Sequence, residues 1–267
     1  MKRILRLVSV WAGVHIRAFV AYRVSFVMNF FAQGLNYAVD FVLMWIMITA
    51  FDDMHGWNAF EVMLLYAVSL TAYAFGGAFF FFVRYSLRTD IPSGAFDDVL
   101  LKPMNILPYL VMKNINLGYI THLTLSITML CVCVTNLGIP VNVATVLYLI
   151  YTIACGALIF GAMFLLITGP LFLMTKEASL SNFLFFFRES SWYPLSIFPR
   201  FLQIIMIVVF PFGMINFFPV QPLLGKQDYL MFGENVIWFI PVFTAAFYTL
   251  AVWFFNFCVK RYKSTGS

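Results

Sequence analysis

Charged residues are scarce in this chain of 267 residues. They make up 10% of it, whereas a typical soluble domain carries about 25%. Hydrophobic residues reach 63%, and phenylalanine alone occurs 33 times. A soluble fold cannot bury this much apolar surface, and the composition also excludes disorder, collagen-like repeats and a disulfide scaffold. We therefore expect an integral membrane protein, built from helices because its apolar runs are long and continuous.

Potential metal ligands and disulfide partners are few and scattered. Cys131 and Cys133 are two positions apart, so they would point to nearly opposite faces of a helix. The three histidines, His15, His55 and His122, form no cluster along the sequence. We expect no metal site, and we interpret the cysteines as small apolar packing residues.

Motifs for catalysis and nucleotide binding are also missing. The Gly225-Lys226 pair is followed by Gln227, where a phosphate loop needs Ser or Thr. The sequence has neither a His-Glu-x-x-His zinc motif nor a Gly-x-Ser-x-Gly nucleophile motif. The chain is therefore not expected to be an enzyme, and uphill transport would need energy from another subunit. Its net charge of +5 does not indicate nucleic-acid binding, because the basic residues gather beside apolar segments and are expected to set the topology.

Long apolar runs predict the membrane spans, since a hydrocarbon core of about 30 Å needs about 20 residues per helix. The qualifying runs are 24–51, 59–83, 109–137, 142–174 and 236–259. Two further apolar stretches, 178–187 and 201–218, precede the last run. If both crossed, the C-terminal basic cluster would lie on the opposite side from the N-terminal one, so we expect only one to cross. The prediction is an all-α integral membrane protein with six transmembrane helices in a single domain over residues 1–267.

Prolines indicate a re-entrant helical hairpin before the last span, in residues 193–219. Proline interrupts a helix, and broken backbone at membrane depth is tolerated only where protein or a cavity surrounds it. The residues singled out in this outer region are Tyr193, Pro194, Pro199, Pro211 and Pro219.

The distribution of basic residues predicts that both termini lie in the cytoplasm. In this topology every Lys and Arg except Arg188, Arg200 and Lys226 faces inward. The loop that carries Asp52 and Asp53 faces outward and has no basic residue. This is the bias expected of a multi-pass membrane protein.

Residues 1–23 are expected to form an amphipathic helix in the membrane interface. Polar positions such as Lys2, Arg6, Ser9, Gly13 and Arg17 recur every three to four residues, and apolar residues fill most of the rest. A basic helix of this kind lies along anionic headgroups. The alternative is a cytosolic helix that packs on a partner.

A polar stripe runs along one face of the first span, formed by Asn29, Gln33, Asn36 and Asp40. A carboxylate near mid-span costs about 2.5–3.5 kcal/mol on insertion scales, so the stripe should face protein or water. One interpretation is a substrate pathway or subunit interface; the other is hydrogen bonding between helices. For Asp40 the sequence offers Arg188 as a cationic partner, unless Asp40 is protonated.

Small residues four positions apart predict close helix packing in two of the spans. These pairs are Ala72 with Gly76 and Ala157 with Gly161. Small side chains let helix backbones approach one another within a membrane.

The segment 84–108 is predicted to be a cytosolic loop that contains a short helix. Ser93 can cap this helix, Asp97 lies in its early turns, and Pro103 ends it. Phe96 and Leu100 would form an apolar face. A two-turn helix is unstable alone, so it should pack either on the protein's own interface helix or on a cytosolic partner.

Two stretches resemble the membrane subunits of ATP-binding-cassette exporters in the type-2 permease superfamily, and most closely the small six-span bacterial branch with a separate ATPase. The first is Ile91-Pro92-Ser93-Gly94-Ala95-Phe96-Asp97-Asp98-Val99-Leu100-Leu101-Lys102-Pro103. The second begins with Tyr193-Pro194-Leu195-Ser196-Ile197-Phe198-Pro199 and continues to Pro211 and Pro219. Lys102 departs from the arginine usual in the family; it keeps the charge but loses the planar guanidinium.

The resemblance implies that the helix in 91–103 is the coupling helix that binds the ATPase, through Ile91, Gly94, Phe96, Asp97, Leu100, Leu101 and Pro103. It implies that residues 193–219 dip back from the outer face. The working unit would contain two ATPase subunits and a second permease chain, identical or related, in the bacterial cytoplasmic membrane. ATP and Mg would bind to the partner ATPase, with no cofactor on this chain.

The sequence therefore predicts an exporter of a hydrophobic or amphipathic substrate, such as a drug or lipid. A proton-coupled secondary transporter that uses Asp40 remains as an alternative. A lipid-modifying enzyme would need clustered acid, base or metal residues, which the sequence lacks, and a purely structural membrane anchor would leave the docking helix unexplained.

Overall fold

The computed structural model describes residues 13, 17, 23–50, 56–173 and 180–264, with the side chains of 47–50, 180 and 181 left out. Within these ranges the chain is helical and has no β-strand. The helices are α2 (Arg23–Ala50), α3 (Ala59–Asp90), α4 (Ala95–Leu100), α5 (Ile106–Lys113), α6 (Tyr119–Asn136), α7 (Val143–Thr168), η1 (Gly169–Phe172), α8 (Leu180–Ser190), η2 (Leu195–Ile197), α9 (Arg200–Ile204), η3 (Ile205–Val209), η4 (Phe212–Met214), α10 (Phe217–Leu224) and α11 (Val236–Val259). The predicted interface helix in 1–23 lies almost entirely outside the described residues, so it stays a prediction.

Asparagine caps begin two of the long helices. At the start of α3, Asn58 Oδ1 accepts from the Glu61 backbone N–H at 2.9 Å, and Glu61 Oε2 accepts from the Asn58 N–H at 2.8 Å. This reciprocal pair is a capping box, which satisfies two otherwise unpaired donors. Asn142 caps α7 by accepting from the Thr145 N–H at 2.8 Å. The polar turns between the apolar runs therefore determine where these helices begin.

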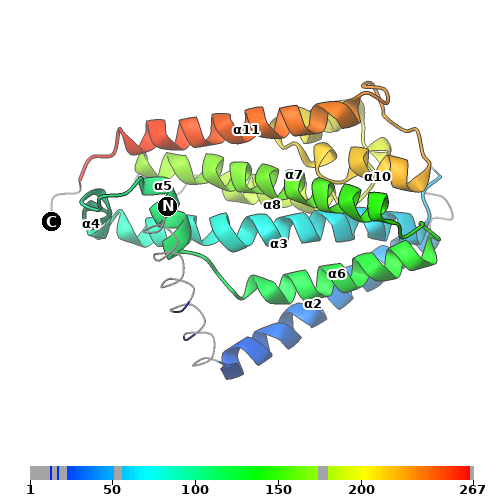
Figure 1. The fold of residues 1–267 in the computed structure, drawn as a ribbon, viewed down its shortest axis with the longest axis horizontal. Coiled ribbons are helices and arrows are strands. Elements are labelled where there is room, and N and C mark those ends of the chain that lie inside the picture. Colours follow the sequence, from blue (N-terminus) through cyan, green and yellow to red (C-terminus); the bar gives the residue numbers. More distant parts are fainter. Residues whose placement is uncertain (1–12, 14–16, 18–22, 51–55, 174–179, 265–267) are drawn as a thin grey trace.

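Helix α3 lies at the centre of the bundle, between α6 and α7, and α11 packs on the other side of α7 (Figure 1). Close approach depends on the small residues. A Cβ atom added to Gly76 would lie 2.7 Å from the Ala157 carbonyl oxygen, and one added to Gly156 would lie 2.8 Å from Ala72 Cβ. The packing predicted for the small residues of the second and fourth spans is therefore confirmed.

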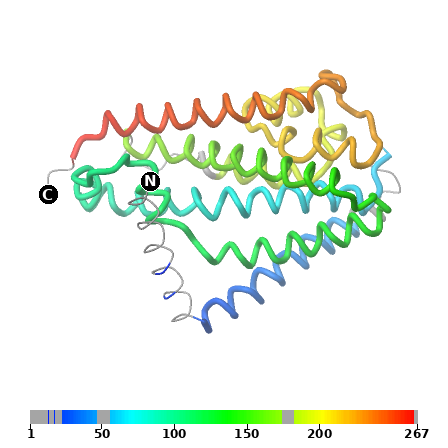
Figure 2. The backbone as a smooth tube through the Cα atoms, viewed as in Figure 1, coloured from blue at the N-terminus to red at the C-terminus, as the bar shows by residue number. Residues whose placement is uncertain are grey.

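Helix α2 joins the bundle only along part of its length. It contacts α3 and α6, and its N-terminal end diverges from them (Figure 2). Many of its side chains are exposed, including Met28, Phe31 and Leu35. α2 is thus attached to the bundle by few interactions.

Among the described residues, four helices are long and apolar enough to cross a membrane, or five if a bent pair counts as one span. The four are α3, α6, α7 with η1, and α11. α2 has 28 residues, but the side chains of its last four lie outside the description, so the predicted span 24–51 stays a prediction. The all-helical membrane architecture is confirmed, and the exact six-span count stays a prediction.

The predicted span 109–137 is wrong in its first ten residues, which belong to a separate helix, α5, and a turn. Asn116 Oδ1 accepts from the Gly118 N–H at 2.6 Å, and the Asn116 N–H donates to the Ala78 carbonyl at 3.0 Å. These bonds stabilise a turn instead of a continuous helix, because asparagine competes with helical hydrogen bonding through its side chain. α3 also continues past the predicted end at Val83, to Asp90.

Residues 180–224 form the region before the last span. α8 has 11 residues, or about 16 Å of helix, which is too short to cross a hydrocarbon core of about 30 Å. The segments Arg200–Val209 and Phe212–Leu224 meet at a 72° bend beside Pro211. This geometry fits either a broken span or a re-entrant loop. The predicted break in this region is present.

Candidate coupling segment and intramembrane polar cluster

The candidate coupling helix α4 lies at the end of the bundle where α5 and the last turn of α11 also lie (Figure 1). Gly94 precedes it with φ of +75°, a left-handed conformation that glycine adopts without steric cost. Because α3 ends at Asp90 and α4 begins at Ala95, this glycine allows the sharp change of direction between them. Gly94 therefore has a conformational role in the segment.

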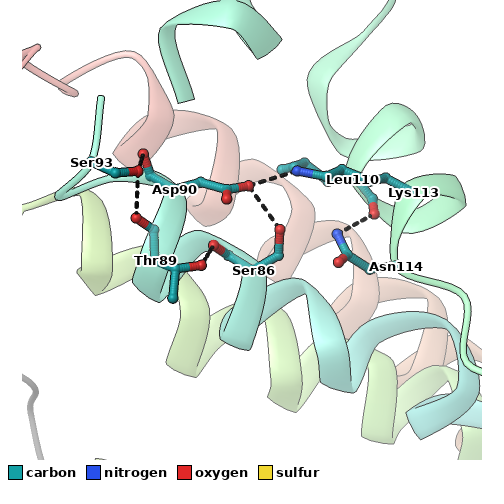
Figure 3. A network of polar contacts seen from close by, with 7 residues as sticks. All are labelled: Ser86, Thr89, Asp90, Ser93, Leu110, Lys113 and Asn114. Carbon is teal, nitrogen blue, oxygen red and sulfur yellow. Dashed lines mark hydrogen bonds and ion pairs between the residues drawn. The ribbon is translucent and has the colours of Figure 1, made fainter. Parts of the chain in front are cut away.

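The end of α3 is held by a polar network that includes α5 (Figure 3). Asp90 Oδ2 accepts from Lys113 Nζ at 2.7 Å and from Ser86 Oγ at 2.8 Å. Ser93 Oγ donates to the Thr89 carbonyl at 2.8 Å. The expected capping of α4 by Ser93 is thus wrong, because its hydroxyl bonds back to the last turn of α3 and Gly94 occupies the cap position.

Phe96 and Leu100 do not form the shared docking face that the sequence suggested. Phe96 is 0% exposed, with its ring 5.0 Å from Phe172 and 4.9 Å from Tyr262. It belongs to an apolar core between α3, α5, η1 and α11. This corrects the expectation that Phe96 contacts a partner: the described chain itself covers this side chain. Its role in the segment is to hold α4 on the bundle.

The surface of the coupling segment is formed by other residues of the motif. Leu100 is 44% exposed and Leu101 is 82% exposed. Pro103 is also exposed, whereas Ile91 is half-buried against the core below. An apolar leucine exposed to this degree at a helix end is a candidate contact for another protein. Leu100 and Leu101 are therefore exposed leucines of the motif that can reach a partner.

The chain beyond α11 binds directly to α4. Ser264 Oγ donates to Asp97 Oδ2 at 2.6 Å, and the Tyr262 ring packs on Phe96. Burial, and then the neighbouring Asp97, raise the pKa of the Tyr262 hydroxyl above its ordinary value. Asp97 was expected as part of an ATPase contact; the structure places it against the C-terminal tail. Sequence reasoning missed Tyr262 and Ser264, because nothing local relates residues so far apart.

A second group of polar side chains lies among α2, α3, α6 and α8. The Tyr66 hydroxyl donates to Asp40 Oδ2 at 3.2 Å, and the Tyr37 hydroxyl forms a hydrogen bond with His122 Nδ1. Tyr37 and Asp40 are three positions apart, so they project from the same face of α2. These contacts connect the middle of α2 to α3 and α6, where its packing is sparse.

Arg188 of α8 lies in an aromatic environment beside this group. Its guanidinium carbon lies 4.2 Å from the centre of the Tyr73 ring and 5.8 Å from that of Trp192. Such cation–π contacts favour a guanidinium outside bulk water. The sequence suggested Arg188 as the partner of Asp40; the structure gives Asp40 the Tyr66 hydroxyl and gives Arg188 the face of Tyr73.

The four residues of the polar stripe differ in exposure. Gln33 and Asp40 are half-buried, whereas Asn29 and Asn36 are exposed on the described chain. The stripe therefore continues from the polar cluster onto the free side of α2. Its exposed part is available to a second chain or to a water-filled path.

The outer residues of the sequence prediction lie around a densely buried segment. Every residue from 211 to 220 is buried, which includes Pro211 and Pro219. Pro194 is buried, Tyr193 is half-buried, and Pro199 is exposed at the start of α9. The Asn216 side chain hydrogen-bonds to backbone carbonyl groups around this segment. Its Nδ2 donates to the Ser191 carbonyl at 2.7 Å and to the Leu65 carbonyl at 3.3 Å. Broken helices are thus accommodated here by burial within protein.

Lys226 binds this segment to the start of α3. Its ammonium lies 3.0 Å from Glu61 Oε2, bonds to the Gly56 carbonyl, and lies 4.6 Å from the centre of the Trp57 ring. The end of the bundle opposite α4 is therefore closed by contacts between the α10 segment and the α2–α3 connection.

Long apolar helices, a buried break before the last span and a short exposed helix at one end define a multi-pass helical membrane protein. Residues 34–266 match the family described as ABC-2 family transporter protein. The chain belongs to this family and is an ABC-2 type permease, a membrane component of a transport system. This confirms the resemblance drawn from the two motifs. Neither the comparison with curated proteins nor that with solved structures gives a match.

Proposed function

We propose that this permease is the membrane-spanning subunit of an ATP-driven exporter, energised by a separate ATPase. The observation that carries the proposal is the combination of family membership with the exposed Leu100–Leu101 pair on α4. Hydrolysis of ATP, with its Mg, would take place on two copies of the partner. The permease would supply no catalytic residue.

The coupling role follows from how α4 is built. Phe96 and the Asp97–Ser264 hydrogen bond attach α4 to the bundle and to the chain beyond α11, while Leu100 and Leu101 remain outside. Movement of a partner that holds these two leucines would then be transmitted to α3 and α11 together. This fits a transporter whose spans rock between inward-facing and outward-facing states.

A second permease chain, identical or related, would complete the pathway. The free side of α2 supports this, because it exposes Asn29 and Asn36 beside apolar side chains such as Phe31 and Leu35. Lipid is a poor solvent for the amide groups, and a second chain would supply hydrogen bonds. The residues Asn29, Gln33, Asn36 and Asp40 would then line the pathway or the interface.

The cargo would be hydrophobic or amphipathic, and it would move out of the cytoplasm across a bacterial inner membrane. Both termini would lie in the cytoplasm. The support for this orientation is the clustering of basic residues, with Lys260, Arg261 and Lys263 just after α11.

A proton-coupled transporter is the second candidate, and the Asp40–Tyr66 hydrogen bond favours it. A carboxyl group within a span is a possible proton site. In this case transport would follow the proton gradient and continue without ATP, whereas the exporter would stop.

Affinity purification in mild detergent tests the main proposal. The unaltered chain should recover a soluble ABC ATPase, and Leu101→Asp should abolish its recovery, because a carboxylate would replace the most exposed apolar contact of α4. Leu101→Met, which keeps an apolar side chain of similar volume, is the matched control and should retain the ATPase. Recovery of the ATPase with Leu101→Asp would remove Leu101 from the interface. Repeated recovery of the permease alone would favour the proton-coupled alternative.

A further inference from the structure

A groove lies between the α4–α5 segment and the last three turns of α11. It has a volume of about 750 Å³. Leu100, Met104 and Ile106 line one side, and Val252, Asn256 and Lys260 of α11 line the other. The lining residues on α11 extend from Tyr248 to Lys260, which is about 18 Å of helix at 1.5 Å per residue.

The groove lies where the sequence of α11 predicts the boundary of the membrane. α11 has no charged residue up to Val259 and is followed by Lys260, Arg261 and Lys263. Half of a hydrocarbon core of about 30 Å is about 15 Å, close to the length of the groove. One end is therefore level with the headgroups and the other with the interior of a single leaflet.

The chemistry of the lining changes along α11. Toward Tyr248 the α11 side is apolar except for the tyrosine hydroxyl, whereas Asn256 and Lys260 lie toward the C-terminal end of α11; Asn105 is on the opposite wall. No acidic residue belongs to the lining within the described chain. Among the basic residues that follow α11, Lys260 lines the groove. Arg261 instead stacks on Phe257, with its guanidinium carbon 4.0 Å from the ring centre.

We propose that the groove binds one anionic phospholipid of the leaflet on the α4 side. The phosphate would lie against Lys260 and Asn256, and an acyl chain would follow Val252 toward Tyr248. The headgroup is selected by charge, and the chain by the apolar walls. The assignment of this leaflet to the cytoplasmic face rests on the proposed function, whereas lipid binding does not.

Such a lipid would touch the coupling segment. Leu100 and Met104 form part of the groove wall and are 44% and 37% exposed. The bound lipid would therefore support the segment from the membrane side, leaving Leu101 free for a protein partner.

Native mass spectrometry of the full-length chain tests this proposal. The detergent-purified protein is incubated with dioleoylphosphatidylglycerol or with dioleoylphosphatidylcholine, which has the same acyl chains and no net charge. We expect one phosphatidylglycerol retained about five-fold more strongly than phosphatidylcholine, the preference expected from one basic residue near an anionic headgroup. Lys260→Gln should abolish this preference, and Lys263→Gln, the neighbouring cation outside the lining, should largely preserve it.

A second pair of variants tests the groove itself. Val252→Trp fills the apolar part and should remove the bound lipid whatever its headgroup. Val242→Trp adds the same ring to the same helix, at a position that is 66% exposed and outside the groove, and should leave binding unchanged. Gel filtration confirms that each variant remains folded.

Three outcomes would overturn the proposal. Equal retention of both lipids by the unaltered chain would exclude selection of an anionic headgroup. Retention unaffected by Val252→Trp would place the lipid elsewhere. Recovery of a dimer that Val252→Trp disrupts, without bound lipid, would assign the groove to an interface between copies of the chain. Loss of ATPase recovery with normal lipid selectivity would instead count against the proposed function alone.

Discussion

Helices α3 and α11 are both long, apolar and suited to crossing a membrane, yet they occupy different environments. In their most apolar stretches 83% of α3 is buried and 22% of α11 is buried, although α11 has the higher mean hydropathy. In lipid, hydrophobicity drives insertion and does not choose which helix forms the core. Burial inside a membrane bundle depends on which helix can be approached closely.

Side-chain size explains the difference. The middle of α3 contains Ala72, Gly76 and Gly77, against which α6 and α7 pack. α11 instead presents large exposed side chains such as Trp238 and Trp253. It is held mainly on α7 and at the α4 end, where Phe255, Cys258 and Tyr262 contact the core around Phe96. The two helices are thus stabilised in different ways, which mutations can separate.

The largest effect is expected where the C-terminal end of α11 packs on the core around Phe96. Phe96→Ala should lower the free energy of unfolding by about 3–5 kcal/mol, because it leaves a cavity in a closed core. Thermal unfolding in detergent measures this loss. Phe239→Ala, at a 63% exposed position of α11, is the control and should change stability little. Similar losses for both variants would mean that α11 is not held by its α4 end.

The next effect concerns the close packing of α3. Gly76→Ala should destabilise by about 1–3 kcal/mol, since its Cβ would lie 2.7 Å from a backbone carbonyl that cannot easily move. Gly34→Ala in α2 is the matched control. No atom lies within 4 Å of its added Cβ, so it should be neutral or stabilising by helix propensity. A neutral Gly76→Ala would show that α3 tolerates looser packing than the structure has.

A smaller effect is expected where α2 meets α3. Tyr66→Phe removes the hydroxyl that donates to Asp40 and should cost about 1 kcal/mol. Hydrogen exchange should show faster opening of α2. Asp40→Asn keeps an acceptor for this hydroxyl and should cost less. If Asp40→Asn lowers the stability more than Tyr66→Phe does, the negative charge of Asp40 itself holds α2 on the bundle. This result would support the proton-coupled transporter.

The smallest effect is expected at the chain beyond α11. Ser264→Ala removes an exposed hydrogen bond to Asp97 and should cost about 0.5 kcal/mol. Its clearer consequence should be faster hydrogen exchange in 95–101, because α4 loses one attachment. Ser264→Thr retains the hydroxyl and serves as control. Unchanged exchange in Ser264→Ala would leave Phe96 and Tyr262 as the main attachment of α4.

Much of the fold could be predicted because local composition controls it. Apolar length located α3, α7 and α11, and polar turns with Asn58 and Asn142 located the starts of α3 and α7. The run from 109 to 137 misled the prediction, because hydropathy does not register the Asn116 turn that divides it into α5 and α6. Prolines marked the break near Pro211, but not the burial of the whole segment 211–220.

The sequence predicted where the candidate coupling helix lies along the chain, but not which of its side chains are buried and which are exposed. The motif at 91–103 located α4, but the apolar pattern of so short a helix did not show that Phe96 is buried and Leu101 is exposed. Asp40 was identified from its cost in a membrane, whereas Tyr66 and His122 come from other helices and have no signal near Asp40 in the sequence.

By itself, then, the sequence determined that this chain enters a membrane as helices, belongs with type-2 permeases and carries a short helix between its second and third predicted spans. These properties depend on composition and on motifs within a few residues of one another. Only the tertiary structure decided that α3 forms the core, that the chain beyond α11 holds α4, and that Asp40 bonds to Tyr66. Those pairings join residues far apart in the chain, and their energies depend on shape and distance, which hydropathy does not encode.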